Sequence, residues 1–304
     1  MSELKTNKIS TNDQNNVAID NALGLKSYDT TARDALTSVA GDMIYNTTTA
    51  KVEAYTGSAW TQLGGLDLQA IDYLVIAGGG GGSKTNSYGG SGGGAGGYRT
   101  SYNSETSGGN ASAETPYYIS TGTNYTITVG AGGAITNDGN ISQFEQVVSV
   151  YGGRGINHPS DQGRHGGNGG SGGGSTGGQA YGVLGQGSDG GASPQGGGGG
   201  AGAVGTTGEG YNVGGEKGGN GGNGLASTIT GSSVTRAGGG GASTLRPTSS
   251  GSPGTGGSGF VALSYPSTLS ITLGAGLTTG VSETTDGSRK YITFTAGTGD
   301  VSWA

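Results

Sequence analysis

Glycine dominates the middle of this sequence and restricts what it can fold into. Of the 108 residues from 152 to 259, 44 are glycine, out of 74 in the whole protein, and a shorter stretch of the same kind covers residues 78–97. Glycine has no side chain to bury and loses more backbone freedom on folding than any other residue. A hydrophobic core therefore does not hold these stretches. They form either a flexible tether or a structure whose backbones pack directly on one another.

The glycines recur with a period of three. Residues 166–174 read Gly-Gly-Asn, Gly-Gly-Ser, Gly-Gly-Gly, and the same period appears at 218–223 and 89–94. Three residues per turn is the period of the polyproline-II helix, which makes no internal hydrogen bonds, so its amides and carbonyls must pair with neighbouring tracts. We therefore predict a bundle of polyglycine-II helices, with a mostly irregular glycine-rich coil as the alternative. Collagen is excluded, because it needs abundant proline and the chain has 6 prolines.

The composition leaves room only for small cores. The hydrophobic fraction is 30%, against about 45–50% in ordinary globular proteins. The apolar residues lie mainly towards the two ends of the chain, so the cores are expected there. Because little apolar area can be buried per residue, association of chains is a natural source of stability. We predict a fibrous homotrimer.

Charge and hydropathy exclude several classes of partner. The net charge of −6 and the absence of a basic stripe argue against nucleic acid. No run of 18 apolar residues exists, so no membrane insertion is expected. The first residues lack the apolar segment of a secretory signal. The chain has no cysteine, which excludes disulfides and thiolate metal sites.

The N-terminal part divides into two predicted segments. Residues 1–40 are expected to form an extended arm ending in a short helix at 32–39, which Thr31 begins with Asp34 three positions later. Residues 41–66 read as a β-hairpin module, with strands at 43–45, 52–55 and 59–63. Tyr45, Tyr55 and Trp60 are the expected core of this module.

The rest of the chain is predicted to be mainly β around the glycine tracts. Residues 67–265 form a glycine-rich domain framed by one antiparallel sheet, with strands at 71–77, 125–129, 146–151 and 260–263. Residues 266–304 alternate apolar and polar side chains again and are expected to form a separate C-terminal β-unit.

Several segments carry a family resemblance. Residues 28–63, with Arg33-Asp34-Ala35-Leu36 and Tyr55-Thr56-Gly57 through Trp60, resemble a module of structural proteins of tailed phages, especially marine ones. Residues 73–80 with 94–99 look like the start of the glycine-rich domain of phage tail fibres, and residues 256–261 look like its end. The glycine-rich part is also similar to the tip adhesins of T-even-type phages.

The resemblance implies a phage virion protein, a tail fibre or adhesin assembled in the host cytoplasm. It implies attachment to other phage tail, baseplate or fibre-adaptor proteins through the N-terminal arm. It also implies multivalent binding of a host surface glycan or outer-membrane protein through loops of the glycine-rich domain. The alternative is a structural virion fibre or decoration protein without receptor specificity.

Side chains that interrupt the glycine tracts are the candidate receptor-binding residues. Aromatic faces stack on sugar rings, and Arg, Asn and Asp hydrogen-bond hydroxyls or acidic groups. Each of these residues can instead plug a loop end, contact a sister chain or keep the fibre soluble. The candidates are Tyr98, Arg99, Tyr102, Tyr151, Arg154, Asn157, His158, Asp161, Arg164, His165, Tyr181 and Tyr211, with Arg236 and Arg246 as further members.

An enzyme is not expected, and neither is a cofactor. The chain has two histidines, His158 and His165, and both fall in a polar glycine-rich stretch. A metal site that adds Asp161 between them, a depolymerase site assembled across chains, and an ice-binding face are the weaker alternatives. An ice-binding face would need regular Thr or Ala repeats along the tracts, and the sequence does not contain them.

Overall fold

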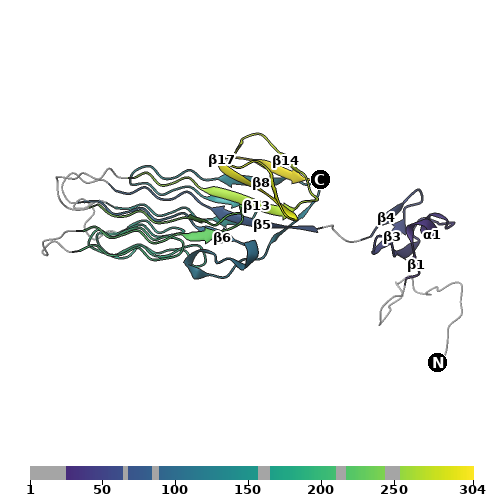
Figure 1. The fold of residues 1–304 in the computed structure, drawn as a ribbon, viewed down its shortest axis with the longest axis horizontal. Helices are drawn as coiled ribbons and strands as arrows, with labels where there is room; N and C mark the ends of the chain where they lie inside the picture. The colour runs from purple at the N-terminus through teal and green to yellow at the C-terminus, as the bar shows by residue number, and fades with distance from the viewer. Residues whose placement is uncertain (1–24, 64–67, 84–88, 157–164, 210–216, 244–253) are drawn as a thin grey trace, which may run out of the picture. The chain divides into compact units, whose positions relative to one another are not determined.

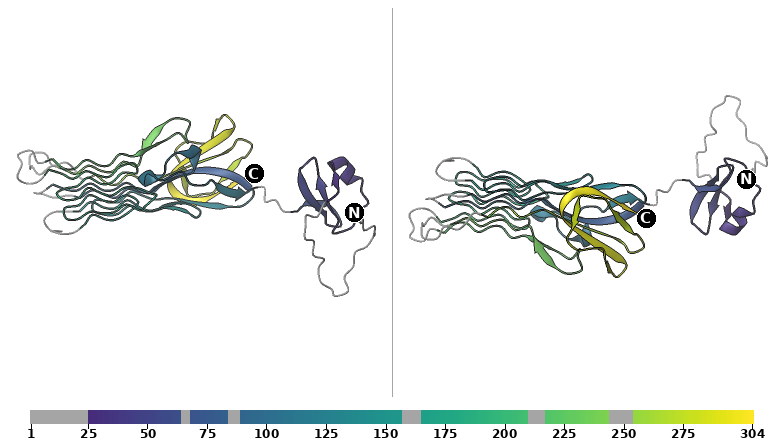
Figure 2. Two further views of the ribbon diagram at one scale, coloured as in Figure 1. Left: turned by 90° about the horizontal axis from the view of Figure 1, so that it is seen from below. Right: turned by 90° about the horizontal axis from the view of Figure 1, so that it is seen from above.

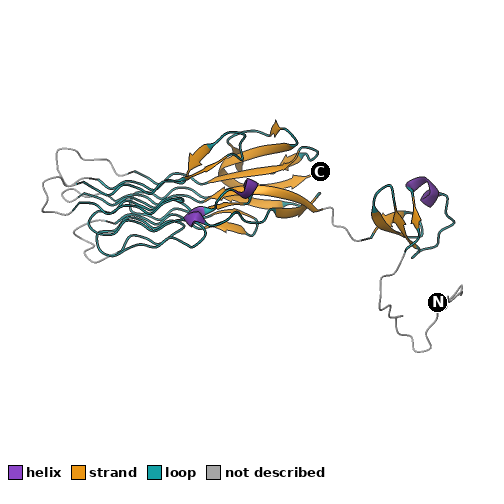
Figure 3. Ribbon diagram, turned by 60° about the horizontal axis from the view of Figure 1, so that its bottom comes forward, coloured by secondary structure: helices purple, strands orange, loops and turns teal. Residues whose placement is uncertain are grey.

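The computed structural model describes residues 25–63, 68–83, 89–156, 165–209, 217–243 and 254–304. The chain divides into two compact units, residues 1–66 and residues 67–304. The described residues are mainly β-strands and extended segments, with a single short α-helix, as the sequence predicts for the fold class (Figure 3).

Unit 1 is a four-stranded sheet with one helical turn beside it. Its strands follow the order β1-β2-β3-β4, in which β1 is parallel to β2 and the other pairs are antiparallel. The three strands that the sequence predicts are present. The elements are β1 (Ser27–Tyr28), α1 (Thr30–Asp34), β2 (Met43–Asn46), β3 (Lys51–Tyr55) and β4 (Trp60–Gln62).

The predicted position of the helix is wrong. Helix α1 begins after Asp29, whose Oδ1 accepts the N–H of Ala32 at 2.7 Å, so Asp29 rather than Thr31 is the N-cap. The helix ends at Asp34 and buries no residue, so no packing extends it towards Val39. A helix this short depends on its cap because isolated turns are unstable.

The centre of unit 1 is polar rather than aromatic. Glu53 and Asn46 are buried, and Glu53 accepts hydrogen bonds from Arg33 Nη1 at 2.8 Å and from Asn46 Nδ2 at 3.1 Å. The rings of Tyr55 and Trp60 are in contact, with centroids 5.4 Å apart, but Tyr45 is exposed. The prediction of a core made by the three aromatic side chains is therefore wrong for Tyr45, because β2 directs Asn46 rather than Tyr45 inwards.

Unit 2 is built on an eleven-stranded sheet. Seven of its strands follow the order β10-β9-β8-β17-β13-β5-β6, while β7 pairs with β5 and β14, β15 and β16 pair with β17. A separate hairpin, β11–β12, completes the strands. The strands are β5 (Leu68–Ile76), β6 (Tyr98–Thr100), β7 (Tyr117–Ser120), β8 (Tyr125–Val129), β9 (Ser142–Phe144), β10 (Val147–Ser149), β11 (Leu225–Ser227), β12 (Val234–Arg236), β13 (Phe260–Pro266), β14 (Ile271–Leu273), β15 (Leu277–Thr279), β16 (Thr284–Asp286) and β17 (Arg289–Trp303), and two 3₁₀ turns lie at Tyr102–Ser104 and Gly108–Asn110.

The sheet is nearly closed into a barrel. Its two end strands, β10 and β6, lie beside each other: Arg99 Nη1 donates to the carbonyl of Val148 at 3.1 Å, and Gly97 N–H donates to the carbonyl of Val150 at 2.7 Å. Ser149 Oγ also donates to the carbonyl of Val75 on β5 at 2.7 Å. Closure leaves few unpaired strand edges.

Aromatic side chains fill the interior of this sheet. Trp303 lies against Tyr125 and Tyr265, with ring centroids 5.8 Å apart in both pairs, and against Phe144 at 6.4 Å. All four side chains are buried in the largest apolar cluster of the unit, which also contains Ile292. Because Trp303 and Ile292 belong to β17, the C-terminal strand is part of the core.

Residues 266–304 do not form a separate β-unit, contrary to the sequence-based expectation. Strand β17 pairs with β13 through residues 289–294 and with β8 through residues 297–301. The strand changes partner at Gly297, where φ is +96°, a conformation that favours glycine. One long strand therefore joins both halves of the sheet, and a local alternation pattern does not reveal that pairing.

The glycine tracts extend from one end of the sheet and run side by side (Figures 1 and 2). In the tract 78–83, the N–H groups of residues 78 and 81 donate to carbonyls in 137–140, those of 79 and 82 to 254–257, and those of 80 and 83 to 91–94. The donor–acceptor distances are 2.8 to 3.0 Å. Every third residue of the tract therefore donates its N–H to the same neighbouring segment.

The tract 196–201 repeats this pattern with other partners. Residues 196 and 199 donate to carbonyls in 172–175, residues 197 and 200 to 203–206, and residues 198 and 201 to 237–240, again at 2.8 to 3.0 Å. A β-strand has hydrogen-bonded neighbours on two sides only. These tracts have them on three.

Close contact between backbones explains why the tracts are glycine. A Cβ at Gly198 would lie 1.9 Å from the carbonyl oxygen of Gly93, and a Cβ at Gly92 would lie 1.8 Å from that of Gly240. Neither residue has a positive φ, so backbone conformation is not the reason. Gly254 differs, because a Cβ there would meet nothing within 4 Å.

A matched pair of substitutions tests this packing. Gly198→Ala should destabilise unit 2 by about 3 kcal/mol, because the methyl group would overlap backbone atoms that can move only with their tract. Gly254→Ala should leave stability unchanged or raise it by up to about 1 kcal/mol, since alanine restricts the unfolded chain. Thermal unfolding by circular dichroism measures both. Equal effects of the two substitutions would contradict direct backbone packing.

Unit 1 should lose stability in acid through Glu53. Burial raises the pKa of this carboxyl, but hydrogen bonds from Arg33 and Asn46 outweigh burial and hold the pKa below its usual value. The contribution of Glu53 is therefore present above pH 4.5, its ordinary pKa, and is lost as the pH falls through the folded-state pKa. Glu53→Gln should cost about 1–3 kcal/mol at pH 7.

The difference between wild type and Glu53→Gln should shrink towards pH 3. Amide NMR signals of residues 43–55, followed during thermal unfolding of the full chain at pH 7 and pH 3, report on unit 1 alone. A difference that is the same at both pH values would show that the ionised carboxylate is not what stabilises the unit.

Candidate functional site

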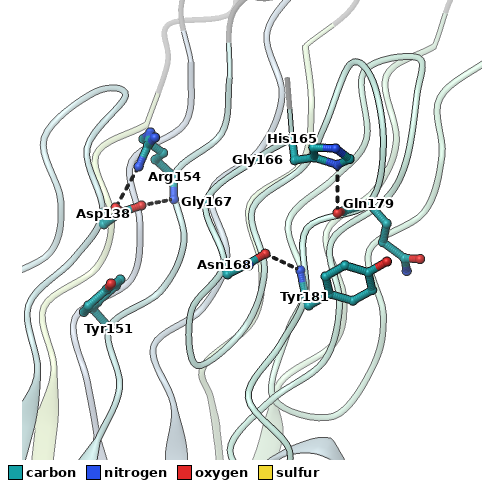
Figure 4. A pocket seen from close by; sticks show the side chains of 9 residues that line it. All are labelled: Asp138, Tyr151, Arg154, His165, Gly166, Gly167, Asn168, Gln179 and Tyr181. Atoms are coloured by element: carbon teal, nitrogen blue, oxygen red, sulfur yellow. Dashed lines mark hydrogen bonds and ion pairs between the residues drawn. The ribbon is translucent and has the colours of Figure 1, made fainter. Parts of the chain in front are cut away.

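Four of the predicted receptor-binding residues lie around one groove on the glycine tracts. They are Tyr151, Arg154, His165 and Tyr181, and the groove has a volume of about 440 Å³. Figure 4 shows their side chains along the tracts, together with Asp138, Asn168 and Gln179. Residues that are up to 43 positions apart in the sequence are thus brought to one surface by tract packing.

Backbone hydrogen bonds fix the two tyrosines. The carbonyl of Tyr151 accepts the N–H of Gly170 at 2.7 Å. The N–H of Tyr181 donates to Asn168 Oδ1 at 2.8 Å, and its carbonyl accepts the N–H of Gly169 at 3.2 Å. Neighbouring residues of one tract, 168–170, therefore connect both tyrosines.

An ion pair closes one end of the groove. Asp138 Oδ2 lies 2.8 Å from Arg154 Nη1, and Asp138 Oδ1 accepts the backbone N–H of Arg154 at 2.8 Å. Because both side chains are partly exposed, the pair contributes little to stability. Its effect is to orient the guanidinium, whose other donors have no acceptor among the described residues.

The other end contains His165 and Gln179. His165 Nδ1 lies 3.1 Å from the backbone carbonyl of Gln179, and Gln179 Nε2 donates to Asp189 Oδ2 at 3.2 Å. Asp189 in turn accepts the N–H of Gly182 through Oδ1 at 2.8 Å. The polar side chains at this end are thus tied to the tracts that carry them.

Two glycines make room for these side chains. A Cβ at Gly167 would lie 2.4 Å from Asp138 Oδ1, and a Cβ at Gly178 would lie 2.0 Å from His165 Cε1. Glycine at these two positions therefore leaves space for the side chains of Asp138 and His165, in addition to allowing contact between backbones.

The chemistry of the groove suits a hydroxyl-rich ligand. Tyr181 is 58% exposed and Tyr151 is 36% exposed, so both present aromatic side chains for stacking. Arg154, Asn168 and Gln179 supply polar atoms within the same groove. The charges of Asp138 and Arg154 balance each other, so the groove has no strong bias towards an anion.

The predicted group at residues 98–102 does not form a binding loop. Tyr98 is on β6 and 0% exposed, and burial raises the pKa of its phenol to about 12. Arg99 is held in a two-point ion pair with Glu114, at 2.7 and 2.6 Å. Tyr102 packs against the second apolar cluster. A buried ring cannot contact a receptor, so Tyr98 is removed from the candidates.

Five of the remaining candidates lie outside the described residues, as does Arg246; the five are Asn157, His158, Asp161, Arg164 and Tyr211. The groove also contains residues that the sequence did not single out, namely Asp138, Asn168 and Gln179. Each interrupts a glycine-rich segment, which is the signal used for the other candidates. The sequence gives no means of choosing between such interruptions without knowing which tracts are neighbours.

In the part of the chain that the structure describes, no group of three or more His, Asp or Glu side chains is placed to hold a metal ion. Within the same ranges, no helix has the length and apolar character needed to cross a membrane. The alternative of a metal site at His158, Asp161 and His165 stays a prediction, because His158 and Asp161 lie outside the described residues.

A family model described as a glycine-rich domain matches residues 48–266, more than two thirds of the chain. The match begins within unit 1 and ends at the last residue of β13. The comparisons with curated proteins and with solved structures gave no match.

Proposed function

Because the chain belongs to the family of glycine-rich domains, we propose that it is an attachment protein whose glycine tracts hold a binding groove. In this proposal it is a tail fibre or adhesin of a phage virion and binds the surface of the host bacterium. The observation that carries the proposal is the groove between Tyr151 and Tyr181, where side chains from separate tracts converge on a framework of paired backbones. Rigid frameworks that present polar and aromatic side chains are typical of recognition sites.

The framework in this proposal is a bundle of polyglycine-II helices. Support comes from the three-residue period with which tracts 78–83 and 196–201 donate to their neighbours. A helix of three residues per turn directs successive N–H groups to three sides in turn. The absence of positive φ at Gly198 and Gly92 agrees with that geometry.

The proposed ligand of the groove is a glycan of the host surface. Two exposed tyrosine faces suit stacking on sugar rings, and the amides of Asn168 and Gln179 suit hydroxyl groups. The volume of about 440 Å³ lies within the range of small-molecule sites. An outer-membrane protein is the other ligand class that the family resemblance suggests.

The proposed assembly is a homotrimer joined through unit 1, which also carries the contact with other virion proteins. In the described part of unit 1, Ile44 is the one buried apolar side chain, while Val39, Met43 and Leu63 are exposed. A unit of this size with so little core usually needs a further source of stability. Several copies on one fibre would convert weak groove contacts into firm attachment through high local concentration.

The proposed role is binding without catalysis. The hydrogen bond recorded for the His165 ring goes to a backbone carbonyl and not to a hydroxyl that it could activate. Asp138 is engaged twice by Arg154. Neither group is arranged as a general base beside a nucleophile.

Adsorption of the fluorescently labelled full-length protein to a panel of bacterial cells tests the proposal. Tyr181→Ala should weaken saturable binding by about tenfold per site, because the ring loses its stacking contact. Tyr118→Ala is the matched control: Tyr118 is 57% exposed on β7 and does not line the groove. It should bind like wild type.

Thermal unfolding and light scattering should show that both variants are folded and have the same number of chains as wild type. Equal adsorption of Tyr181→Ala and wild type would remove the groove as the binding site. A folded protein that binds no strain, including the host, would favour the second candidate, a structural virion fibre or decoration protein. Deleting residues 154–165 is a poorer test, because it also removes Gly155, whose N–H donates to Gly81.

A further inference from the structure

A second cleft lies where the glycine tracts meet the sheet, and none of the groove residues lines it. Its volume is about 490 Å³. Apolar side chains of Ile76 and Phe260 form part of its wall, and Arg236, at the end of the β11–β12 hairpin (green in Figure 2), lies beside them. Gly238, Gly257 and Thr295 also line the cleft.

Arg236 carries a charge with no counter-charge among the residues that the structure describes. Its guanidinium carbon lies 4.2 Å from the centre of the Phe260 ring, and its recorded hydrogen bond is a long one, 3.5 Å from Nη1 to the carbonyl of Val234. Among the described residues, no carboxylate forms an ion pair with Arg236. Glu105 Oε1 accepts hydrogen bonds from the N–H and the hydroxyl of Thr228, at 2.8 and 2.7 Å, rather than from Arg236.

Four other arginines are ion-paired, in contrast to Arg236. Arg33, Arg99, Arg154 and Arg289 each lie within 2.6 to 2.8 Å of a carboxylate oxygen. Burial of Arg236 is the largest influence on its guanidinium and lowers the pKa of that group. Since the arginine pKa stays far above neutrality, the group is a partly desolvated cation, and the described residues engage one of its N–H donors.

Gly238 and Gly257 line the same cleft. Among the described residues, no acceptor takes the N–H of Gly238 or of Gly257, whereas the N–H groups of tract 196–201 are all paired. Packing does not require glycine at these two positions: a Cβ at Gly257 would meet nothing within 4 Å, and one at Gly238 nothing closer than 3.7 Å. A gap between tracts therefore stays open next to an unpaired cation.

We propose that this cleft binds an organic carboxylate of about the size of a sugar acid, with its carboxylate on Arg236 and its body against Phe260 and Ile76. An arginine fork matches the two oxygens of a carboxylate. The free amides of Gly238 and Gly257 supply donors for further oxygens of the ligand. The volume falls within the range of small-molecule sites. This site is independent of the groove at Tyr151 and Tyr181.

Titration of the ¹⁵N-labelled full-length protein with D-glucuronate tests the proposal, with D-glucose as the probe of similar shape that lacks the carboxylate. Glucuronate should shift the amide signals of Gly238, Gly257 and Phe260 saturably, and glucose should not. Arg236→Gln should weaken binding by about tenfold or more, since a charged hydrogen-bond donor is lost. The affinity of Arg236→Lys for glucuronate should lie between those of wild type and Arg236→Gln, because lysine keeps the charge but lacks the forked pair of donors.

Two controls separate this site from the proposed attachment groove and from misfolding. Arg154→Gln, which alters the groove, should bind glucuronate in the cleft like wild type. The amide spectrum of Arg236→Gln should otherwise match that of the wild type, which shows that the fold is intact. If that spectrum is not preserved, Arg236→Lys, which keeps the positive charge, should still bind glucuronate preferentially over glucose.

Three outcomes would overturn the proposal. They are no saturable shift with glucuronate, equal shifts with glucuronate and glucose, and undiminished glucuronate binding by folded Arg236→Gln. None of them bears on cell adsorption through Tyr181, so the cleft and the groove can fail separately.

Discussion

Backbone hydrogen bonding is the constraint on which the rest of this structure depends. Where the chain consists of glycine, it has no side chains to exclude water or to pair with buried amides, so its polar backbone must pair with itself. The tracts 78–83 and 196–201 solve this by donating to three neighbours in rotation. That arrangement needs contact closer than any Cβ allows, as at Gly198, so composition and architecture follow from one requirement. The nearly closed sheet supplies what the tracts lack, a core of buried aromatic side chains around Trp303.

Local patterns in the sequence predict part of this fold and not the rest. Alternating apolar residues identify the strands of unit 1. The hydrogen bonds of tracts 78–83 and 196–201 recur with a period of three, although neither tract is one of the Gly-Gly-X repeats in the sequence. The partners of each tract could not be predicted, because one Gly-Gly-Asn triplet looks like another. Nor could the role of β17 be predicted, since its pairing with β8 joins residues that are 168 to 176 positions apart in the sequence. The predicted N-cap of α1, Thr31, lies two residues after the observed one, Asp29, because both residue types are good caps.

The sequence likewise identifies some residues of the candidate site and fails to identify others. The rule that polar and aromatic residues interrupt glycine tracts where they can bind identifies Tyr151, Arg154, His165 and Tyr181, which share a groove. The same rule also selects Tyr98 and Arg99, which the fold uses internally: one ring is buried in β6, and one guanidinium is paired with Glu114 fifteen residues later. Arg236 is the reverse case, a candidate that lies in another cleft and lacks an acidic partner among the described residues. Only the packing of tracts distinguishes a structural interruption from an available one.

Hydrogen exchange of individual amides measures the central claim most directly. If the tracts are a packed structure, the amides of all six residues in 196–201 should exchange slowly, because each one donates to a neighbouring tract. The amides of Gly238 and Gly257, which have no acceptor among the described residues, should exchange rapidly in the same protein and serve as the internal reference. Slow exchange at all six consecutive positions would also differ from an exposed edge strand, which protects alternate residues. Exchange of the whole run at the rate of an unstructured chain would contradict the account and make the tracts a flexible tether.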